Sequence, residues 1–516
     1  MITEINMVVD PATAYTPMRL TAAVSTQMGV DANRIRHVHV VKRSIDARQR
    51  SVKINLTLKV WLDEAPSADE LPARTIDYPH LSEDARQAIV VGAGPAGLFA
   101  ALRLIERGIR PILLERGKDV DSRRKDMARI AREGIVDPDS NYCFGEGGAG
   151  AYSDGKLYTR SKKRGPVDKV LKILYDHGAS EDILVDAHPH IGTDKLPEVI
   201  KAIRETIIRC GGIVRFETCV TDLIISDGKV EGVVTRDGSE FLGPVILATG
   251  HSARDVYHLL LAKGVSLEPK GIAVGVRLEH PQELIDRIRY HSPAGRGKYL
   301  PPAEYSLLTR VDGRGVYSFC MCPGGFIIPA ASEPGQLVVN GMSPSNRGTR
   351  WANSGMVVEV LPEDVKGSGD DDVLKMMRFQ EEIERAFYAD GDGSQNAPAQ
   401  RMEDFVKGRP SSTLPSTSYA PGIHPARIDQ LLPRGIASRL RKGFEDFGRK
   451  QRGFLTNDAT LIGAETRTSS PVRITRDPET LHHLKFPGLY PAGEGAGYAG
   501  GIVSAAIDGM RVADAV

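Results

Sequence analysis

The sequence predicts an α/β fold, in which a Rossmann-like dinucleotide-binding domain carries an inserted α+β domain and follows a small N-terminal α+β module. Three observations predict this fold. A strand, a glycine-rich turn and an amphipathic helix follow one another within residues 88–107. A second glycine-rich helix start lies at residues 493–501. Between them, over residues 269–454, the α/β pattern is interrupted, and a chain of 516 residues is long enough for about two to four domains.

The N-terminal module is expected to span residues 1–84. Apolar and polar residues alternate through residues 52–62, which is the period of a half-buried strand. Residues 38–42 can form its partner strand, with residues 44–49 as the connection. Residues 64–84 are rich in Pro, Asp and Glu, which is typical of a linker.

The first part of the dinucleotide-binding domain is expected over residues 85–268. It should begin with a strand at residues 88–91, a helix at 95–107 that ends at Gly108, and a strand at 111–114. A second helix should carry the apolar stripe at positions 196, 199, 200, 203 and 207.

Thr193 or Asp194 is expected to cap that second helix, and Gly211–Gly212 to end it. Short strands should follow, with hairpin turns at the two Asp-Gly pairs 227–228 and 237–238. These strands are predicted at residues 213–216, 220–225, 230–235 and 241–247.

The inserted α+β domain is expected over residues 269–454. Its helix should span about 373–388 between loops at 366–372 and 389–398. Strands are predicted at residues 272–279, 315–322 and 337–342. Residues 455–516 should complete the dinucleotide-binding domain with a strand at 488–492 and a helix at 502–514.

The turn before the first helix reads Gly92-Ala93-Gly94-Pro95-Ala96-Gly97. Gly92 permits a tight turn, Gly94 lets the backbone approach a pyrophosphate, and Gly97 allows close helix–strand packing. The helix N-terminus offers unpaired N–H groups to phosphates. Glu115 ends the next strand, where an acid can bind ribose hydroxyls and repel a 2′-phosphate.

A second anchor favours FAD over NAD because a longer cofactor needs one. The strand at residues 245–250 ends in Ala248-Thr249-Gly250, and the later turn Gly493-Glu494-Gly495 leads through Gly500 and Gly501 into the last helix. Glu494 can bind ribitol hydroxyls, and the helix N-terminus can stabilise negative charge on a reduced flavin ring.

The fingerprint VVGAGPAGLFAALRLIERG…LLERG, the ATG strand and the terminal PAGEGAGYAGG resemble glutathione-reductase-type flavoproteins. Segments 141–157, 188–194, 319–325, 465–474 and 491–506 also resemble a family of uncharacterised bacterial FAD-dependent dehydrogenases, over almost the whole chain. Glu494 stands where the wider superfamily more often has Asp.

The resemblance implies the roles of several residues toward FAD. Val220 should meet the adenine through its backbone. The ADP half should contact Gly92, Gly94, Pro95, Ala96, Glu115 and Arg116. The pyrophosphate and flavin side should be lined by Gly147, Gly148, Ala149, Ser153 and Lys156. The ribitol and ring should be held by Glu494, Gly501 and Ile502.

Cys320 and Cys322 lie two apart on a predicted strand, so both side chains should face the same way. Two interpretations of this pair stay open: a redox dithiol beside the flavin, and a pair of buried inert thiols. A regular strand separates the two positions by about 6.6 Å, which disfavours a disulfide between them. Arg467 can bind an anionic substrate or the flavin edge, or pair with a Glu to order its loop.

Several function classes are disfavoured. His188 and His190 have no Cys or carboxylate at ligand spacing, so no metal site is expected there. The net charge of +1 argues against nucleic acid, although the basic run Arg160, Lys162, Lys163 and Arg164 could meet phosphates. Five cysteines and the lack of a long apolar run suggest a reduced, cytoplasmic protein without a membrane span.

The sequence therefore predicts an FAD-dependent oxidoreductase, acting on an unidentified small organic substrate under the inserted domain. Because the chain has one dinucleotide fingerprint, a second domain for NAD(P)H is missing, and NAD(P)H is expected at most as a transient electron donor. Two alternatives stay open: a flavin-dependent RNA-modifying protein, and a non-catalytic flavin sensor or scaffold whose N-terminal module docks a protein partner.

Overall fold

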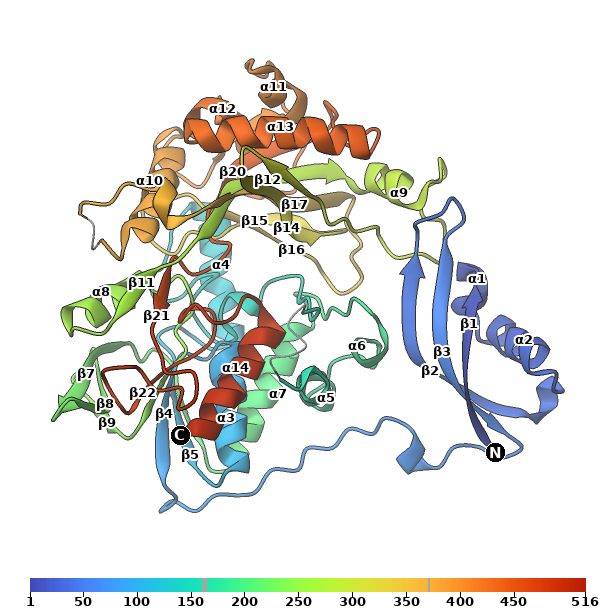
Figure 1. Cartoon of the computed structure of the whole chain (residues 1–516), viewed down its shortest axis with the longest axis horizontal. Helices are drawn as coiled ribbons and strands as arrows, with labels where there is room; N and C mark the ends of the chain where they lie inside the picture. The colour runs from blue at the N-terminus through green and yellow to red at the C-terminus, as the bar shows by residue number, and fades with distance from the viewer. Residues whose placement is uncertain (160–164, 370–371) are drawn as a thin grey trace.

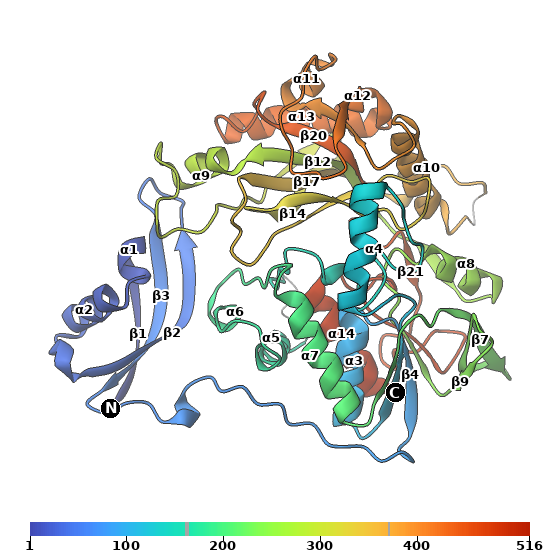
Figure 2. The same cartoon turned by 180° about the vertical axis from the view of Figure 1, so that it is seen from behind.

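The computed structural model describes residues 1–159, 165–369 and 372–516. Figures 1 and 2 show three parts: a small sheet with two helices beside the N-terminus, a parallel sheet with its helices, and a larger sheet that helices cover on one face. The basic run predicted at residues 160–164 lies outside the described residues.

The N-terminal part is a three-stranded antiparallel sheet in the order β1-β3-β2. Alternate residues of β3 are buried against Leu20 and Val24 of α2, as the sequence pattern predicts. The predicted partner strand is a segment of a longer strand, and β1 was not foreseen. The elements are β1 (Ile2–Val9), α1 (Pro11–Ala14), α2 (Pro17–Met28), β2 (Ile35–Asp46) and β3 (Lys53–Leu62).

The linker has one short 3-10 helix, Ala68–Glu70, and otherwise extends to the parallel sheet (Figure 1). That sheet has the order β22-β10-β4-β5-β6. Its strands are β4 (Gln87–Val91), β5 (Arg110–Leu114), β6 (Ile213–Arg215), β10 (Val245–Leu247) and β22 (Leu489–Pro491).

Helices and a small sheet cover the two faces of the parallel sheet, which buries most of β4, β5, β10 and β22, while the edge strand β6 is partly exposed. One face packs on α3 (Pro95–Glu106), α7 (Leu196–Arg209) and α14 (Ile502–Ala515). The other face packs on α8 (Arg254–Ala262) and on the sheet β7-β8-β9. This is the Rossmann-like arrangement that the sequence predicts. Four helices among the described residues of this domain were not foreseen: α4 (Val120–Glu133), α5 (Val167–Asp176), α6 (Asp182–Val185) and α8.

Two local predictions are wrong. The single strand expected at 241–247 is two strands, β9 (Glu240–Leu242) and β10, because Gly243 turns the chain with φ +140° into a different sheet. Lys195, not Thr193 or Asp194, is the N-cap of α7. The Asp194 carboxylate instead accepts hydrogen bonds from the backbone and hydroxyl of Ser345.

Both predicted Asp-Gly hairpin turns are confirmed, between β7 (Val220–Ser226) and β8 (Lys229–Thr235) and between β8 and β9. Asp227 and Gly228 both have positive φ, 50° and 74°, as a tight hairpin turn with the strand twist requires.

The inserted part is built on a seven-stranded sheet in the order β13-β14-β17-β12-β20-β18-β19. Its strand β20, between β12 and β18, lies after residue 454, so this segment belongs to the inserted sheet and not, as predicted, to the dinucleotide-binding domain. The strands are β12 (Ile272–Pro281), β13 (Leu308–Val311), β14 (Arg314–Cys322), β17 (Trp351–Val360), β18 (Ala397–Arg401), β19 (Ile423–Pro425) and β20 (Thr460–Glu465).

Helices cover the outer face of this sheet (Figure 1), and the hairpin β15–β16 lies on the side of the parallel sheet. A two-stranded pair, β11 (Leu267–Pro269) with β21 (Val472–Ile474), joins the two halves. The remaining elements are α9 (Gln282–Tyr290), β15 (Phe326–Pro329), β16 (Val339–Met342), α10 (Lys375–Ala389), α11 (Met402–Lys407), α12 (Ile428–Leu431) and α13 (Arg434–Lys450).

Candidate cofactor and active site

A cavity of about 370 Å³ lies at the carboxyl ends of β4, β5 and β10 and reaches the inserted domain. Ligands of open parallel sheets bind at this edge. The cavity is lined by most of the residues predicted to bind the cofactor: Gly92, Gly94, Pro95, Ala96, Glu115, Arg116, Gly148, Ala149, Ser153, Lys156, Val220, Ala248, Thr249, Gly250, Glu494, Gly500, Gly501 and Ile502.

The glycines of the fingerprint are fixed by close packing. Gly92 has φ +101°, and a Cβ there would lie 2.5 Å from the carbonyl oxygen of Ala248. A Cβ on Gly97 would lie 1.9 Å from the carbonyl oxygen of Gly92. Gly97 therefore shapes the turn from behind and does not line the cavity. Gly94 and Gly148 lie against each other in the cavity wall, where a Cβ on Gly148 would lie 3.3 Å from the Gly94 Cα, so backbone lines the cavity at this point.

The Glu115 carboxylate is buried and accepts three backbone hydrogen bonds. One oxygen accepts from Ala93 N at 2.8 Å, and the other from Gly117 N and Gly145 N at 2.9 and 3.0 Å. Glu115 thus holds the fingerprint turn against the loop that follows α4 while it lines the cavity. The predicted hydrogen bond to ribose stays a prediction.

Arg116 stands at the same end of the cavity. Its guanidinium lies 4.7 Å from the centre of the Phe144 ring and pairs with Asp255. Val220, Thr218 and Cys219 complete this end. The mixture of backbone edges and an arginine-stacked ring suits a flat, polar group such as adenine.

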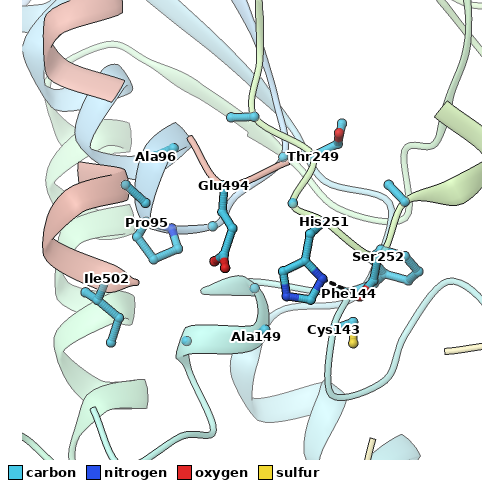
Figure 3. Close-up of a pocket in the computed structure, with 18 of the residues that line it drawn as sticks. Pro95, Ala96, Cys143, Phe144, Ala149, Thr249, His251, Ser252, Glu494 and Ile502 are labelled. Atoms are coloured by element: carbon cyan, nitrogen blue, oxygen red, sulfur yellow. Dashed lines mark hydrogen bonds between the residues drawn. The ribbon is translucent and has the colours of Figure 1, made fainter. Parts of the chain in front are cut away.

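The second anchor is set by α14. Asp508 accepts a hydrogen bond from Gly493 N at 2.7 Å and pairs with Arg476 at 2.6 Å. The Glu494 side chain then points into the cavity (Figure 3). In the part of the chain that the structure describes, no group donates a hydrogen bond to its carboxylate. Burial raises the pKa of Glu494 to about 7, which Lys270 only partly offsets.

Three glycines leave open space beside this anchor. A Cβ on Gly250, Gly500 or Gly501 would meet nothing within 4 Å. All three line the cavity, and Gly501 precedes the first turn of α14. A cofactor can therefore lie directly against the backbone, with the N-termini of α3 and α14 both available to negative charge.

Arg467 lines the cavity and is held by a buried network. It donates to both Glu384 oxygens at 3.1 and 3.0 Å, to Ser332 Oγ at 2.5 Å and to Gln336. Although burial of Glu384 opposes its ionisation, Arg467 and Arg254 hold the pKa of this carboxyl at about 2. The predicted Arg–Glu pair is therefore present, and binding of an anionic substrate by Arg467 stays a prediction.

His251 is a cavity residue that sequence reasoning missed. Figure 3 shows its ring beside Glu494, with a hydrogen bond of 3.2 Å between its Nδ1 and Ser252 Oγ. Burial, together with the positive charges of Arg467 and Arg254, lowers the pKa of His251 to about 4. The imidazole is therefore neutral near pH 7.

Cys320 lines the cavity, whereas Cys322 is fully buried behind it. The prediction that both side chains face the same way on a regular strand is wrong. The register of β14 against β17 shifts between Phe319 and Cys322, and Cys320 has φ +45°. A bulge with one extra residue breaks the alternation on which that prediction rested. Both thiols are free.

Lys156 lies between the cavity and the inserted domain, where its ammonium donates to the Met321 carbonyl. Next to it, Asp154 pairs with Arg347 at 2.7 Å. His188 pairs with Glu304 at 2.5 Å, and His190 contacts the Ser345 carbonyl. Within the described residues, no group of three His, Cys, Asp or Glu side chains could hold a metal ion.

Four predicted site residues do not line the cavity: Gly97, Gly147, Gly493 and Cys322. Each of the three glycines lies one position from a residue that lines the cavity, and it shapes the turn that places that residue. Conversely, several wall residues were not predicted. Thr218, Cys219, His251 and Ser252 follow strand ends, Cys143 and Phe144 come from the loop after α4, and Phe319 and Asn340 come from the inserted domain.

Comparison with known families supports FAD as the occupant. A family model described as "FAD binding domain" matches residues 85–129, and one described as "FAD-dependent protein, C-terminal domain-like" matches residues 271–468. Residues 1–61 match a domain of unknown function. An uncharacterized protein of Clostridium beijerinckii is 41% identical over 511 residues, which covers 96% of this chain and 95% of that protein.

Solved structures show weaker similarity. The structure of CtdE in complex with FAD is 12% identical, with a TM-score of 0.34 and 84% of each chain covered. That of 3-ketosteroid-Δ4-(5α)-dehydrogenase from Rhodococcus jostii RHA1 is 14% identical, with a TM-score of 0.34, and covers 85% of this chain and 98% of that chain. Placement among glutathione-reductase-type flavoproteins stays a prediction. None of the described helices is long and apolar enough to cross a membrane.

Proposed function

Because the chain belongs to the same family as the Clostridium beijerinckii protein and carries the domains of FAD-dependent proteins, we propose that it is an FAD-dependent oxidoreductase. Its active site would be the cavity between the parallel sheet and the inserted domain. The observation that carries the proposal is the continuity of this cavity, which joins the fingerprint turn, the second glycine-rich anchor and polar groups of the inserted domain.

The residues present fit FAD. Gly94 and Gly148 place no side chain over the N-terminus of α3, so a pyrophosphate in the cavity can approach the backbone N–H groups there. Gly500 and Gly501 leave room beside α14, whose N-terminus can stabilise negative charge. When bound, FAD supplies the two-electron chemistry, and the chain supplies orientation and electrostatics.

The chain's own groups near the second anchor define what a substrate would meet. His251 is a neutral imidazole, which can donate a hydrogen bond at one ring nitrogen and accept one at the other. Glu494 titrates near neutral pH, so it can exchange a proton in the working range. Arg467 offers a fixed positive charge for an anionic group of a small organic substrate.

A first experiment tests the cofactor. The purified protein should release FAD on heating, identified by mass, and Gly94→Val should be purified with little FAD because its side chain would enter the gap to Gly148. Gly435→Ala, in an exposed turn of α13, is the matched control and should keep the cofactor. A wild-type protein that neither retains nor binds FAD would end the proposal.

A second experiment tests the electron donor. The holoprotein is titrated anaerobically with NADPH and then NADH, and the visible flavin band is followed. Fast bleaching would support a nucleotide-linked reductase half-reaction. Bleaching by dithionite alone would count against NAD(P)H as the direct donor and favour oxidation of an organic substrate.

A further inference from the structure

Cys320 and Cys322 are brought out of regular strand geometry at the wall of the cavity. Between Phe319, opposite Gly355, and Cys322, opposite Asn353, β14 has one residue more than β17. The extra residue forces Cys320 to φ +45°, in the left-handed region that non-glycine residues rarely adopt. Such strain persists where the surrounding structure over-determines it, and it is found most often at functional sites.

Two cations surround the thiols. Arg277 donates through Nη2 to the Cys320 carbonyl at 2.7 Å and to Cys322 Sγ at 3.3 Å. Lys156 donates to the carbonyl of the residue between them. Glu465 partly balances this charge by pairing with Arg277 at 3.3 Å. Nearby cations favour a thiolate, which is the reactive form of a cysteine.

The two thiols also interact with each other, and their environments differ. The Cys322 thiol donates a hydrogen bond to the Cys320 carbonyl oxygen at 3.4 Å. The nearby Cys322 thiol, followed by the charges of Lys156 and Arg277, lowers the pKa of Cys320. The nearby Cys320 thiol and burial raise the pKa of Cys322. Cys320 is thus the nucleophilic member, open to the cavity, and Cys322 is the protonated member behind it.

Cys210 shows what an inert thiol in this chain looks like. It is buried at the end of α7, and its Sγ donates to the Tyr78 carbonyl at 3.8 Å. Burial raises the pKa of Cys210. It has no second cysteine beside it and does not line the cavity. Cys320 differs from it because it lines the cavity and has a lowered pKa, and Cys322 differs from it because a second cysteine and the Arg277 guanidinium lie beside it.

We propose that Cys320 and Cys322 form a redox-active dithiol–disulfide pair that exchanges two electrons with the bound FAD. In the oxidising direction, both S–H bonds break, the two protons leave to solvent or cavity bases, and one Sγ–Sγ bond forms. The two electrons released pass to FAD. The reverse step returns two electrons and two protons to the sulfurs. The inference rests on the proposed function, because FAD is the electron partner.

An electron count tests the pair. Air-oxidised holoprotein is titrated anaerobically with dithionite, and the equivalents consumed up to complete flavin bleaching are measured. Wild type should take up about four electrons per FAD, two for the flavin and two for the disulfide. Cys320→Ser and Cys322→Ser should each take up about two. Cys210→Ser, the matched control outside the cavity, should behave as wild type.

Peptide mapping on the same samples gives a readout that needs no turnover. Trypsin releases residues 315–347 as one peptide, which contains Cys320 and Cys322 and no other cysteine. After alkylation, this peptide should carry no label in the air-oxidised wild type and two labels after reduction. Each serine variant should carry one label in both states.

The outcomes separate this inference from the proposed function. A yellow wild-type protein that takes up about two electrons and carries two labels throughout would overturn the dithiol and leave the oxidoreductase standing. A chain without reducible flavin, in which the peptide still loses both labels on oxidation, would refute the electron transfer to FAD together with the proposed function. The serine variants remain informative as long as they stay yellow, which reports a folded site.

Discussion

Gly97 is the residue at which the fingerprint depends most on the absence of a side chain. Its Cβ position overlaps the Gly92 carbonyl oxygen, and both partners are backbone, so neither can move without shifting α3 or β4. We expect Gly97→Ala to lower the free energy of unfolding by about 2–4 kcal/mol and to reduce the FAD content. Urea unfolding and the ratio of flavin to protein absorbance measure both effects.

The same substitution elsewhere provides the control. Gly435 lies in a helix too, but it is exposed, and its Cβ would meet only the movable end of Arg439. Gly435→Ala should therefore stabilise α13 by about 0.5–1 kcal/mol, through helix propensity alone. Equal effects of the two substitutions would show that close packing is not what Gly97 provides.

The raised pKa of Glu494 predicts that the stability of the FAD-free protein depends on pH. Because burial raises its pKa from 4.5 to about 7, the folded state binds the proton more tightly than the unfolded state, and stability falls as the pH rises through this interval. Glu494→Gln mimics the protonated form. It should therefore be about 1 kcal/mol more stable than wild type at pH 8, after allowance for solvent in the cavity, and equal to it at pH 4.5.

Urea unfolding of the two proteins at both pH values measures the difference. Glu479→Gln, on an exposed loop, is the control and should change little at either pH. A gain from Glu494→Gln that is the same at pH 4.5 and 8 would contradict the titration and point to a packing effect.

At the scale of elements, α14 positions the second anchor through one buried ion pair. Asp508 holds both Arg476 and the Gly493 amide, so Asp508→Ala leaves a buried guanidinium without its partner. We expect a loss of about 3–5 kcal/mol in the free energy of unfolding and a weaker affinity for FAD.

Asp514, in the last turn of the same helix, offers a matched substitution. Its ion pair with Arg103 is exposed to solvent, so Asp514→Ala should cost no more than about 0.5 kcal/mol. The affinity is measured by titrating FAD into the FAD-free variants and following flavin fluorescence. If both substitutions weakened binding equally, Asp508 would not be the residue that fixes the turn.

The sequence could predict those elements whose pattern is local. The strand–turn–helix at residues 88–107, the stripe of α7 and the Asp-Gly hairpins all follow from periodicity and turn chemistry. The placement of β20 could not be predicted, because its partners β12 and β18 are distant in sequence. The bulge at Cys320 likewise depends on pairing with β17, and His251 lines the cavity only because a strand ends beside it.

At the scale of the whole molecule, the cavity and the N-terminal module are separate. The module has its own core, against which Leu300 also packs. Arg43 pairs with Asp182 and Asp186, and its carbonyl accepts a hydrogen bond from Ala187 N. His39 Nδ1 lies 3.7 Å from the Glu181 carboxylate, and the Ala47 carbonyl contacts His291. All residues that line the cavity lie at or beyond Val91. Docking of a protein partner by this module therefore remains a proposal that is independent of FAD binding.

We expect a chain that begins at Glu64 to keep its FAD and to melt within a few degrees of the full-length protein. The linker is retained because Leu81 donates a backbone hydrogen bond to Cys210 and Thr75 one to Asp176. In the full chain, Arg43→Ala should loosen only the docking of the module and speed proteolysis within residues 64–77. Loss of FAD from the shortened chain would instead show that the module supports the cofactor site, and its contacts with α6 would then be the first to test.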